Sequence, residues 1–268
     1  MNCFQESRRI VIKIGSSTLT HKSGHINIRR MEQIVKILSD IHNSGKDLIL
    51  VSSGAIAVGV GKLGLRERPS DTASKQAAAA VGQCELMYLY DKMFAEYNHS
   101  VSQVLMTRDI IEDEHRKQNA MNAFRRLIDF GTIPIVNEND TVAVDEIEFG
   151  DNDTLSAIVA KLTGADVLVL MSDIDGLYSG NPRTNPDVQL IPKVEKITPE
   201  IESIAEEAGS SRGTGGMITK IHAAQIAVEA GIDMAIINGE HPEQLYQLFD
   251  GETVGTHFTA RRNDPEGE

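Results

Sequence analysis

Several residue types are scarce in this sequence, and each scarcity excludes a class of protein. The chain has 268 residues, of which only two are cysteines, Cys3 and Cys84, and none is tryptophan. Two cysteines give neither a disulfide framework nor the paired spacing of a zinc motif, so a reducing compartment is the simple interpretation. No apolar run approaches the roughly 20 residues of a membrane span, and residues 1–9 lack the apolar core of a secretion signal. We therefore expect a cytoplasmic protein with no membrane partner.

Basic residues are also few. The 26 Lys and Arg residues face 39 Asp and Glu residues, which gives a formal net charge of -13. Nucleic-acid binding depends on clustered Lys and Arg, so the composition argues against a nucleic-acid partner. The same negative field repels phosphates and carboxylates at long range. Any such ligand must be held locally, by backbone N–H groups, helix N-termini and a few placed lysines.

Short β-branched, apolar runs alternate with stretches of helical periodicity. Alternation of this kind predicts a parallel sheet covered by helices on both faces, with ligands at the carboxyl ends of the strands. The segment 178–192 interrupts the rhythm with two Asn-Pro turns, and we interpret it as a surface hairpin or flap. The expected strands are 10–14, 48–51, 101–106, 133–136, 167–171 and 234–237, and the expected helices are 28–43, 73–97, 116–129, 153–163 and 217–230.

The first two expected strands end in residues suited to anion binding. Lys13 is followed by Gly15 and two serines, a combination that offers an ammonium and several N–H groups to phosphate oxygens. Alternatively, Lys13 is a strand-end lysine that extends to solvent. The second strand ends at Ser53-Gly54 just before a helix, so Ser53 is either an anion contact or a plain N-cap. A dinucleotide-type glycine pattern at 59–64 follows a helical stretch rather than a strand end, which excludes it as a cofactor loop.

Amides and carboxylates are dense after the fourth expected strand. The block Asn137–Asp140 is followed by a second block, 149–154, that contains Asn152 and Asp153. One such residue would serve as a helix cap, but two clusters this close favour recognition of a polar, zwitterionic ligand. A calcium loop is the weaker alternative, because the spacing does not match an EF-hand.

Two further segments suit a nucleotide. Ser172 and Asp173 follow the fifth expected strand, and a glycine-rich loop, 213–216, opens the helix that contains Lys220. Lys220 lies inside that helix, so the loop is not a Walker A motif, although glycine N–H groups and a lysine charge serve phosphate in the same way. The alternative is a glycine-rich turn before an ordinary helix. No Ser-His-Asp or His-Glu arrangement can be argued.

Taken together, these blocks resemble the amino acid kinase family, and within it the branch that phosphorylates glutamate. The matching segments are 11–15, 51–55, 75–82, 137–140, 150–157 and 213–220, in order along nearly the whole chain. The resemblance implies a three-layer αβα sandwich around a mainly parallel eight-stranded sheet. It implies a kinase domain over residues 1–258, with a glutamate-binding N-terminal half and an ATP-binding C-terminal half. Residues 259–268 would form a short charged tail where many relatives carry an RNA-modification-type (PUA) domain.

The activity implied by the resemblance is ATP-dependent phosphorylation of L-glutamate to L-glutamyl 5-phosphate, the first step of proline biosynthesis. Mg²⁺ would be held mainly through the ATP phosphates, with no metal ligand in the chain. Proline would be a feedback inhibitor and the protein a homo-oligomer. Carried over by position, the catalytic residues are Lys13, Asp153 and Lys220, and the glutamate contacts are Ser53, Gly54, Asp140 and Asn152. The ATP contacts are Lys13, Ser172, Asp173, Thr214, Gly215, Gly216, Met217, Ile218, Thr219 and Lys220.

Asp153 is expected to orient the two lysines rather than to act as a base, because a glutamate side chain with a pKa near ~4.3 is already ionised at neutral pH. Three alternatives remain at this point. One is a kinase of the same fold that acts on another small acid, such as acetylglutamate or carbamate. The others are a non-catalytic nucleotide or amino-acid sensor and a nicotinamide-dependent enzyme.

Overall fold

The apolar runs in the described part of the chain fold into one sheet of eight strands. The computed structural model describes residues 3–142, 152–182, 184–207 and 216–260. The strands lie in the order β3-β4-β2-β1-β5-β7-β8-β6 across the sheet. Every pair of neighbouring strands is parallel except β7 and β8. The expected eight-stranded, mainly parallel sheet is confirmed. The strands are β1 Arg9–Ile14, β2 Asp47–Ser52, β3 Val101–Met106, β4 Ile133–Glu138, β5 Val167–Ser172, β6 Lys193–Val194, β7 Asp233–Asn238 and β8 Thr256–Phe258.

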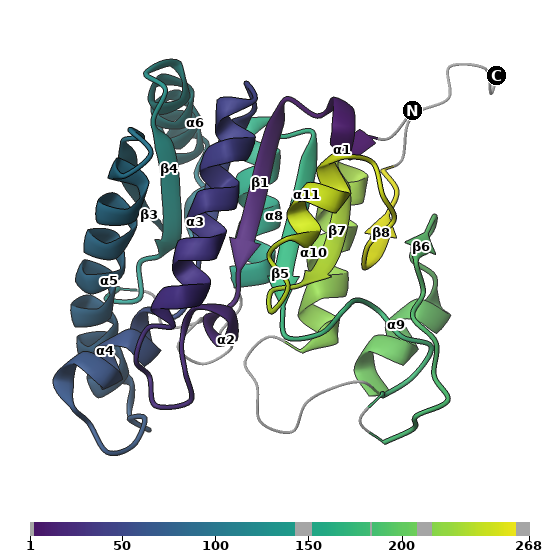
Figure 1. Cartoon of the computed structure of the whole chain (residues 1–268), viewed down its shortest axis with the longest axis horizontal. Helices are drawn as coiled ribbons and strands as arrows, with labels where there is room; N and C mark the ends of the chain where they lie inside the picture. Colours follow the sequence, from purple (N-terminus) through teal and green to yellow (C-terminus); the bar gives the residue numbers. More distant parts are fainter. Residues whose placement is uncertain (1–2, 143–151, 183, 208–215, 261–268) are drawn as a thin grey trace.

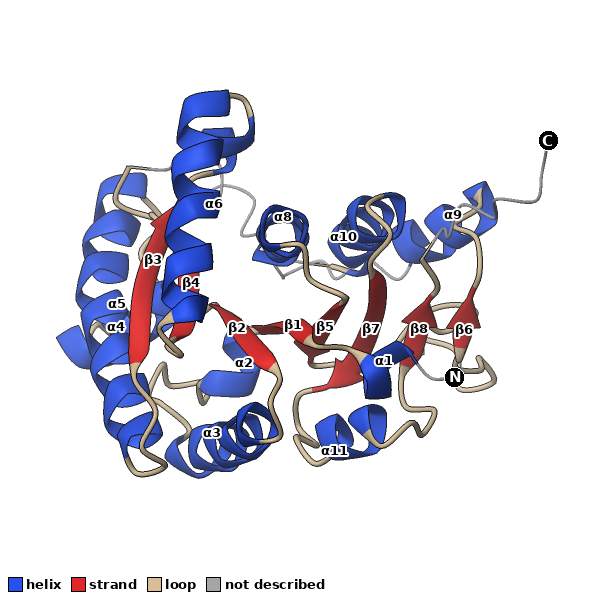
Figure 2. Ribbon diagram, turned by 90° about the horizontal axis from the view of Figure 1, so that it is seen from above, coloured by secondary structure: helices blue, strands red, loops and turns tan. Residues whose placement is uncertain are grey.

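Helices cover both faces of this sheet, which gives the three layers visible in Figure 2. On one face lie α6, α8, α9 and α10, and on the other lie α1, α3, α4, α5 and α11 (Figures 1 and 2). The helices are α1 Cys3–Glu6, α2 Ser16–Leu19, α3 Ile28–Asn43, α4 Ala55–Leu63, α5 Thr72–Ala95, α6 Glu114–Asp129, α8 Asn152–Thr163, α9 Pro199–Glu207, α10 Met217–Glu229 and α11 Gln244–Phe249, with the 3-10 turn η1 Arg108–Ile111.

The strand pleat divides the interior into two cores. Successive side chains of a strand point to opposite faces. Ile10, Ile12 and Ile14 of β1 therefore pack on the α3 and α5 side, whereas Val11 packs with α8 and α10. Lys13 has the same parity as Val11. The alternation thus directs its side chain toward the layer that contains α8 and α10.

Short elements were absent from the expectations. The strands β6 and β8 have two and three residues, and α1 and α2 have four residues each, too few to show a period. The expected hairpin in 178–192 is confirmed by an antiparallel bridge between Tyr178 and Leu190. Thr256 of β8 supports its base, since the hydroxyl accepts from Leu177 N and donates to Ile191 O.

The glycine pattern at 59–64 serves helix packing. Gly59 lies inside α4, and a Cβ there would stand 1.8 Å from the carbonyl oxygen of Ala78 in α5. In α5, a Cβ on Gly82 would stand 1.8 Å from Ala55 O. Such distances are impossible for any side chain, so both glycines are required for the close approach of α4 and α5. The pattern at 59–64 thus lies within α4 and at its C-cap rather than at the end of a strand.

None of the helices in the described part of the chain combines the length and apolar character needed to cross a lipid bilayer. Of the expected tail, Thr259 and Ala260 continue from β8, and the remainder lies outside the described residues.

Candidate active site

A buried carboxylate holds two lysines at the carboxyl end of the central strands. Asp153 Oδ1 lies 2.6 Å from Lys13 Nζ, and Asp153 Oδ2 lies 3.0 Å from Lys220 Nζ. Lys13 belongs to β1, Asp153 to the first turn of α8 and Lys220 to the first turns of α10. The structure therefore brings together the three residues expected to be catalytic, which the sequence separates by up to about 200 positions.

Burial distinguishes these two ion pairs from the surface pairs of the protein. The side chains of Lys13, Asp153 and Lys220 are 10%, 1% and 5% exposed, whereas the pair Arg126–Asp129 is 74% and 53% exposed. Burial alone would raise the pKa of the Asp153 carboxyl. The charges of Lys13 and Lys220 and their hydrogen bonds outweigh it and hold that pKa well below its usual range. Asp153 is therefore ionised at neutral pH and a very weak base.

The N-terminus of α10 approaches the same carboxylate. The hydroxyl of Thr219 donates to Asp153 Oδ2 at 2.9 Å. Gly216 is the extended N-cap residue of α10 and makes no side-chain cap, as glycine has none. The first N–H groups of a helix lack partners within that helix, and the dipole is positive there, so this end suits an anion.

A second polar cluster surrounds Asn152, the first residue of α8. Its Nδ2 faces three oxygens, those of Ser52 O at 3.1 Å, Ser53 Oγ at 2.9 Å and Asn137 Oδ1 at 3.0 Å. Asn137 at the end of β4 in turn donates to Gln83 Oε1 of α5 at 2.7 Å. These contacts connect the ends of β2 and β4 to the N-terminus of α8. Because Ser52 O is a carbonyl oxygen that can only accept, the group facing it must be the NH₂ of Asn152, which defines the orientation of that amide.

The carbonyl oxygen of the Asn152 side chain is available to accept a hydrogen bond. Asn152 is 8% exposed, and its buried Oδ1 has no hydrogen-bond partner among the described residues. A buried polar atom without a partner costs free energy unless a ligand or water supplies one. An ammonium or hydroxyl group of a ligand would satisfy it.

Behind this cluster, Ser52 contacts a tyrosine in the core. Ser52 Oγ lies 3.0 Å from Tyr90 Oη, and Tyr90 of α5 is fully buried. Burial raises the pKa of Tyr90, so its hydroxyl stays neutral. The pair ties the end of β2 to α5 and fixes the strand end that precedes Ser53 and Gly54.

Gly54 provides the turn from β2 into α4. Its φ of 101° lies in the left-handed region that favours glycine, and it is the N-cap residue of α4. The N-terminus of α4 therefore opens at the same edge of the sheet as those of α8 and α10. Of the two expected contacts in this turn, Ser53 lies beside Asn152, with its Oγ 2.9 Å from Asn152 Nδ2.

Asp140 follows β4 in a turn at this edge. It is half-buried, and burial raises the pKa of its carboxyl to about 6, against the opposing charge of Arg68. A carboxylate that is costly to ionise alone gains from a cationic partner. The structure places Asp140 at the expected edge.

The expected nucleotide contacts lie on the other side of Lys13. Ser172 ends β5, and its hydroxyl donates to Asp173 Oδ1 at 3.2 Å. Met217, the first residue of α10, has its side chain buried in the core. Only its backbone is therefore available to contact a nucleotide. Ile218 also packs against that core. Thr214 and Gly215 lie outside the described residues.

Comparison with known proteins fits this arrangement. The profile of the amino acid kinase family matches residues 8–238. The chain belongs to the amino acid kinase family. A protein named glutamate 5-kinase from Clostridium perfringens is 53% identical over 264 residues, covering 97% of this chain and 98% of its own length. One of the same name from Clostridium tetani is 55% identical over 256 residues and covers 96% of each chain.

Solved structures of two other kinases share the architecture. UMP kinase from Bacillus anthracis superposes with a TM-score of 0.61 at 16% identity, covering 96% of this chain and 97% of its own. A substrate complex of isopentenyl phosphate kinase superposes with a TM-score of 0.63 at 21% identity, over 93% and 99% of the two chains. These likenesses concern the fold alone.

Three residues at this family member's site were not expected in the roles that the structure gives them. Gln83 carried no signal, because nothing local in α5 marks it as the partner of Asn137. Asn137 stood in a recognised block but was not singled out. Thr219, which is also predicted to contact ATP, donates its hydroxyl to Asp153, a contact that the sequence did not indicate. Only the register between strands and helices could have revealed these contacts.

Proposed function

We propose that this chain transfers the γ-phosphoryl group of ATP to the side-chain carboxylate of L-glutamate, giving L-glutamyl 5-phosphate and ADP. The reaction would be the first step of proline biosynthesis. The observation that carries the proposal is the buried Lys13–Asp153–Lys220 arrangement next to the Asn152 cluster. It occurs in a chain about half identical to proteins named glutamate 5-kinase over nearly its full length.

The lysines answer the main physical difficulty of the reaction. A glutamate carboxylate must approach a polyanionic phosphate, and phosphoryl transfer depends mostly on positioning and charge stabilisation. Lys13 and Lys220 supply two positive charges on either side of one carboxylate, in a site shielded from water. As a carboxylate oxygen bonds to the γ-phosphorus, the bond to the β–γ bridging oxygen breaks and ADP leaves with the electron pair. The lysines offset the charge that shifts onto the transferring and leaving oxygens.

Asp153 orients the lysines and takes no proton. Both of its oxygens are engaged by ammonium groups, and its pKa lies well below the usual range. The glutamate side chain needs no base either, because it is ionised at neutral pH. The nucleophile is therefore ready as it binds, and the site needs no histidine.

The Asn152 cluster suits the amino-acid end of glutamate. The Oδ1 of Asn152, which lacks a hydrogen-bond partner within the described parts of the chain, would accept from the substrate ammonium, and Asp140 would pair with the same positive charge. Ser53 and Gly54, at the N-terminus of α4, would contact a substrate carboxylate. In this assignment the N-terminal half of the chain binds glutamate.

The C-terminal half would bind ATP. Ser172, Asp173 and the segment 214–220 would line the nucleotide, with the N–H groups of α10 directed at its phosphates. Mg²⁺ would enter with ATP and add positive charge to its phosphates. Because each oxygen of Asp153 already faces an ammonium, the ion would be held mainly through phosphate oxygens. The kinase domain would then extend over residues 1–258, followed by a short charged tail.

A substrate panel tests the proposal. ADP release is measured with L-glutamate, acetylglutamate, aspartate, carbamate and UMP, and the chain is expected to turn over glutamate. Activity on acetylglutamate but not on glutamate would overturn the assignment. Binding of ATP without release of ADP would favour a non-catalytic sensor. Binding of NAD but not of ATP in a calorimetric titration would favour a nicotinamide-dependent enzyme.

A matched pair of variants connects the activity to the site. Lys220→Met should lower turnover by about 10²-fold or more, as loss of one charge-stabilising donor does elsewhere. Lys193→Met removes an exposed lysine of β6, 53% accessible, and should leave turnover unchanged. Equal turnover in the two variants would contradict the role of Lys220.

Regulation and assembly extend the proposal. Proline carries a carboxylate and an amine like those of glutamate, and would compete with glutamate around Asp140 and Asn152. The protein would be a homo-oligomer in the cytoplasm. Excess glutamate should relieve such inhibition, and inhibition indifferent to glutamate would contradict it. Light scattering at several protein concentrations would give the oligomeric state.

A further inference from the structure

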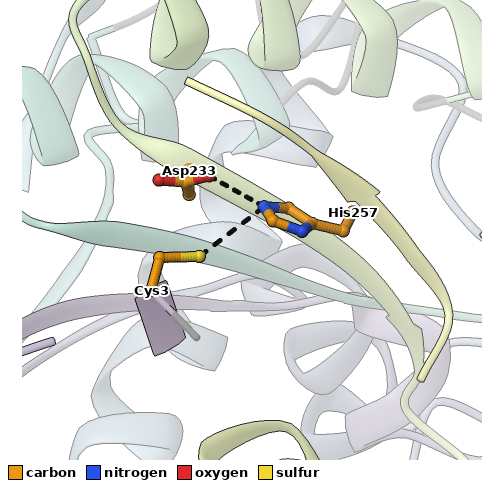
Figure 3. Close-up of side chains that lie close together, drawn as sticks. All are labelled: Cys3, Asp233 and His257. Atoms are coloured by element: carbon orange, nitrogen blue, oxygen red, sulfur yellow. Dashed lines mark hydrogen bonds and ion pairs between the residues drawn. The ribbon is translucent and has the colours of Figure 1, made fainter. Parts of the chain in front are cut away.

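Three metal-ligand side chains from the two ends of the chain meet away from the active site. Cys3 lies in α1, Asp233 is the first residue of β7, and His257 lies in β8 (Figure 3). The Nε2 atom of His257 lies 2.8 Å from Asp233 Oδ1 and 3.7 Å from Cys3 Sγ. One ligand atom from each residue lies within 4.8 Å of the other two. The three side chains point toward one another, as Figure 3 shows.

This cluster is at the opposite end of the sheet from the lysines. The strand β7 begins at Asp233 and ends at Asn238, and Asn238 is in register with Ser172 at the active-site edge. Five steps of about 3.3 Å separate the two ends, or about 17 Å. Nothing in the proposed phosphoryl transfer uses these residues.

The surroundings combine a buried anion with reachable partners. The side chain of Asp233 is 6% exposed and that of His257 is 24% exposed, and Cys3 is half-buried. Asp233 Oδ1 also accepts from Ala260 N at 3.2 Å, and the ring of Phe4 packs edge-on against His257. The carboxylate is thereby fixed by its backbone contact, while a small ion could reach the cluster from the side of the histidine.

We propose that Cys3, Asp233 and His257 form a binding site for one divalent transition-metal ion, with Zn²⁺ as the natural occupant. Thiolate, imidazole and carboxylate are the ligand types that Zn²⁺ takes in proteins. Tetrahedral bond lengths require about 3.6 Å between sulfur and nitrogen and about 3.4 Å between nitrogen and oxygen. The Sγ–Nε2 separation already fits, and the Nε2–Oδ1 contact must open by only about 0.6 Å. A water molecule completes the four ligands.

The charge and proton balance is simple. The thiol loses one proton to solvent as sulfur binds the ion, and the proton of His257 moves from Nε2 to Nδ1. Two anionic ligands then neutralise the ion, so no net charge is buried. The site would tie α1 to β7 and β8, and thus the N-terminal helix to the last strands of the sheet.

Sequence spacing could not reveal this site, because its ligands are not near neighbours along the chain. Cys3 precedes Asp233 by 230 positions, and another 24 separate Asp233 from His257. Metal motifs are recognised from short intervals between ligands. Only the packing of α1 against the edge of the sheet brings the cysteine to the pair.

The test uses Co²⁺ and Zn²⁺ alone, added to the full chain after treatment with a chelator. Co²⁺ bound to a thiolate gives a sulfur-to-metal charge-transfer band, which exposed histidines cannot produce. We expect one equivalent of Co²⁺ to generate this band and one equivalent of Zn²⁺ to abolish it. Absence of the band in the unmodified chain would overturn the proposal, whatever the variants do.

Variants identify the ligands. Cys3→Ala should remove the band, and His257→Gln should weaken Zn²⁺ binding by at least about 100-fold, more than the loss of an outer-shell partner costs. The matched controls are Cys84→Ala, at an exposed position of α5, and His115→Gln, at an exposed position of α6. Both are expected to bind Co²⁺ and Zn²⁺ as the unmodified chain does. Loss of the band in Cys84→Ala but not in Cys3→Ala would refute the assignment. Equal Zn²⁺ affinity in all variants would reveal adventitious binding and refute it too.

Discussion

Replacement of Asp153 by Asn tests the centre of the site. The change keeps the size of the side chain but removes the negative charge between Lys13 and Lys220. Both ammonium groups are at most 10% exposed, so they would be left buried without their anion and would repel each other. Loss of one partner from a buried ion pair costs about 3–5 kcal/mol. We expect Asp153→Asn to lower the free energy of unfolding by that amount at pH 7.

The pH dependence of this loss has a defined sign. The pKa of Asp153 is depressed in the folded state, so its stabilisation is fully present above its unfolded value of about 3.9. It disappears as pH falls below that value toward the folded pKa. The difference in stability between the original chain and Asp153→Asn should therefore stay flat from pH 8 to about 5 and narrow below about 4.

Urea unfolding followed by circular dichroism measures this difference. Asp129→Asn is the matched control, because Asp129 pairs with Arg126 on the exposed face of α6 at 3.8 Å. Such surface pairs contribute about 0–1 kcal/mol. A loss for Asp153→Asn no larger than that of the control would refute the reasoning about the buried lysines.

Activity provides a second measurement on the same variant. Disordered lysines should lower turnover by about 10²-fold, as misplacement of catalytic groups by an ångström does. The acidic limb of the pH–rate profile should stay where it is, because Asp153 exchanges no proton in the reaction. If that limb disappears in Asp153→Asn, the residue acts as a base and its proposed role is wrong.

Three further predictions concern two other residues of the site and the packing of α4 on α5. With Asp140 as partner of the substrate ammonium, kcat/KM for glutamate should fall about tenfold from pH 7 to pH 5, with an inflection near 6 that Asp140→Asn abolishes. Asn152→Ala should raise KM for glutamate more than KM for ATP, and equal effects in a steady-state assay would contradict its place at the amino-acid end. Gly82→Ala would place a Cβ 1.8 Å from Ala55 O, so it should lower the free energy of unfolding by at least about 1–3 kcal/mol. The control Ala80→Ser, at an exposed position of α5, should change that free energy by less than about 0.5 kcal/mol.

Much of the fold follows from local patterns. The six expected strands all exist, and 101–106 agrees with β3 at both ends. Continuous apolar runs mark strands buried on both faces, and the structure buries every residue of β5. The helix expected at 28–43 also matches α3 at both ends, since Asn27 caps its start by accepting from Arg30 N. The missed β6 and β8 are too short for a period, and their pairing depends on partners far away in the chain.

The contacts within the site follow less directly from sequence. Residue types and strand ends identify Lys13, Asn152 and Asp153 as polar groups at one edge of the sheet. Which oxygen meets which ammonium depends on the pleat of β1 and on the placement of α8 and α10, which are long-range properties. The interaction of Asn137 with Gln83 likewise requires that α5 pass behind β4. The residues around Gln83 in the sequence give no sign of this contact.

The carboxylate of Asp153 explains why two flexible lysines can form a precise site. Each lysine side chain carries about 2 kcal/mol of rotamer entropy that must be lost when its ammonium is fixed. Because both oxygens of one buried carboxylate already hold them, this loss occurs on folding and not when the substrates arrive. Lys13 comes from the half of the chain assigned to glutamate, and Lys220 from the half assigned to ATP. A single anion in the first turn of α8 thus sets the spacing between the two ammonium groups before any substrate binds.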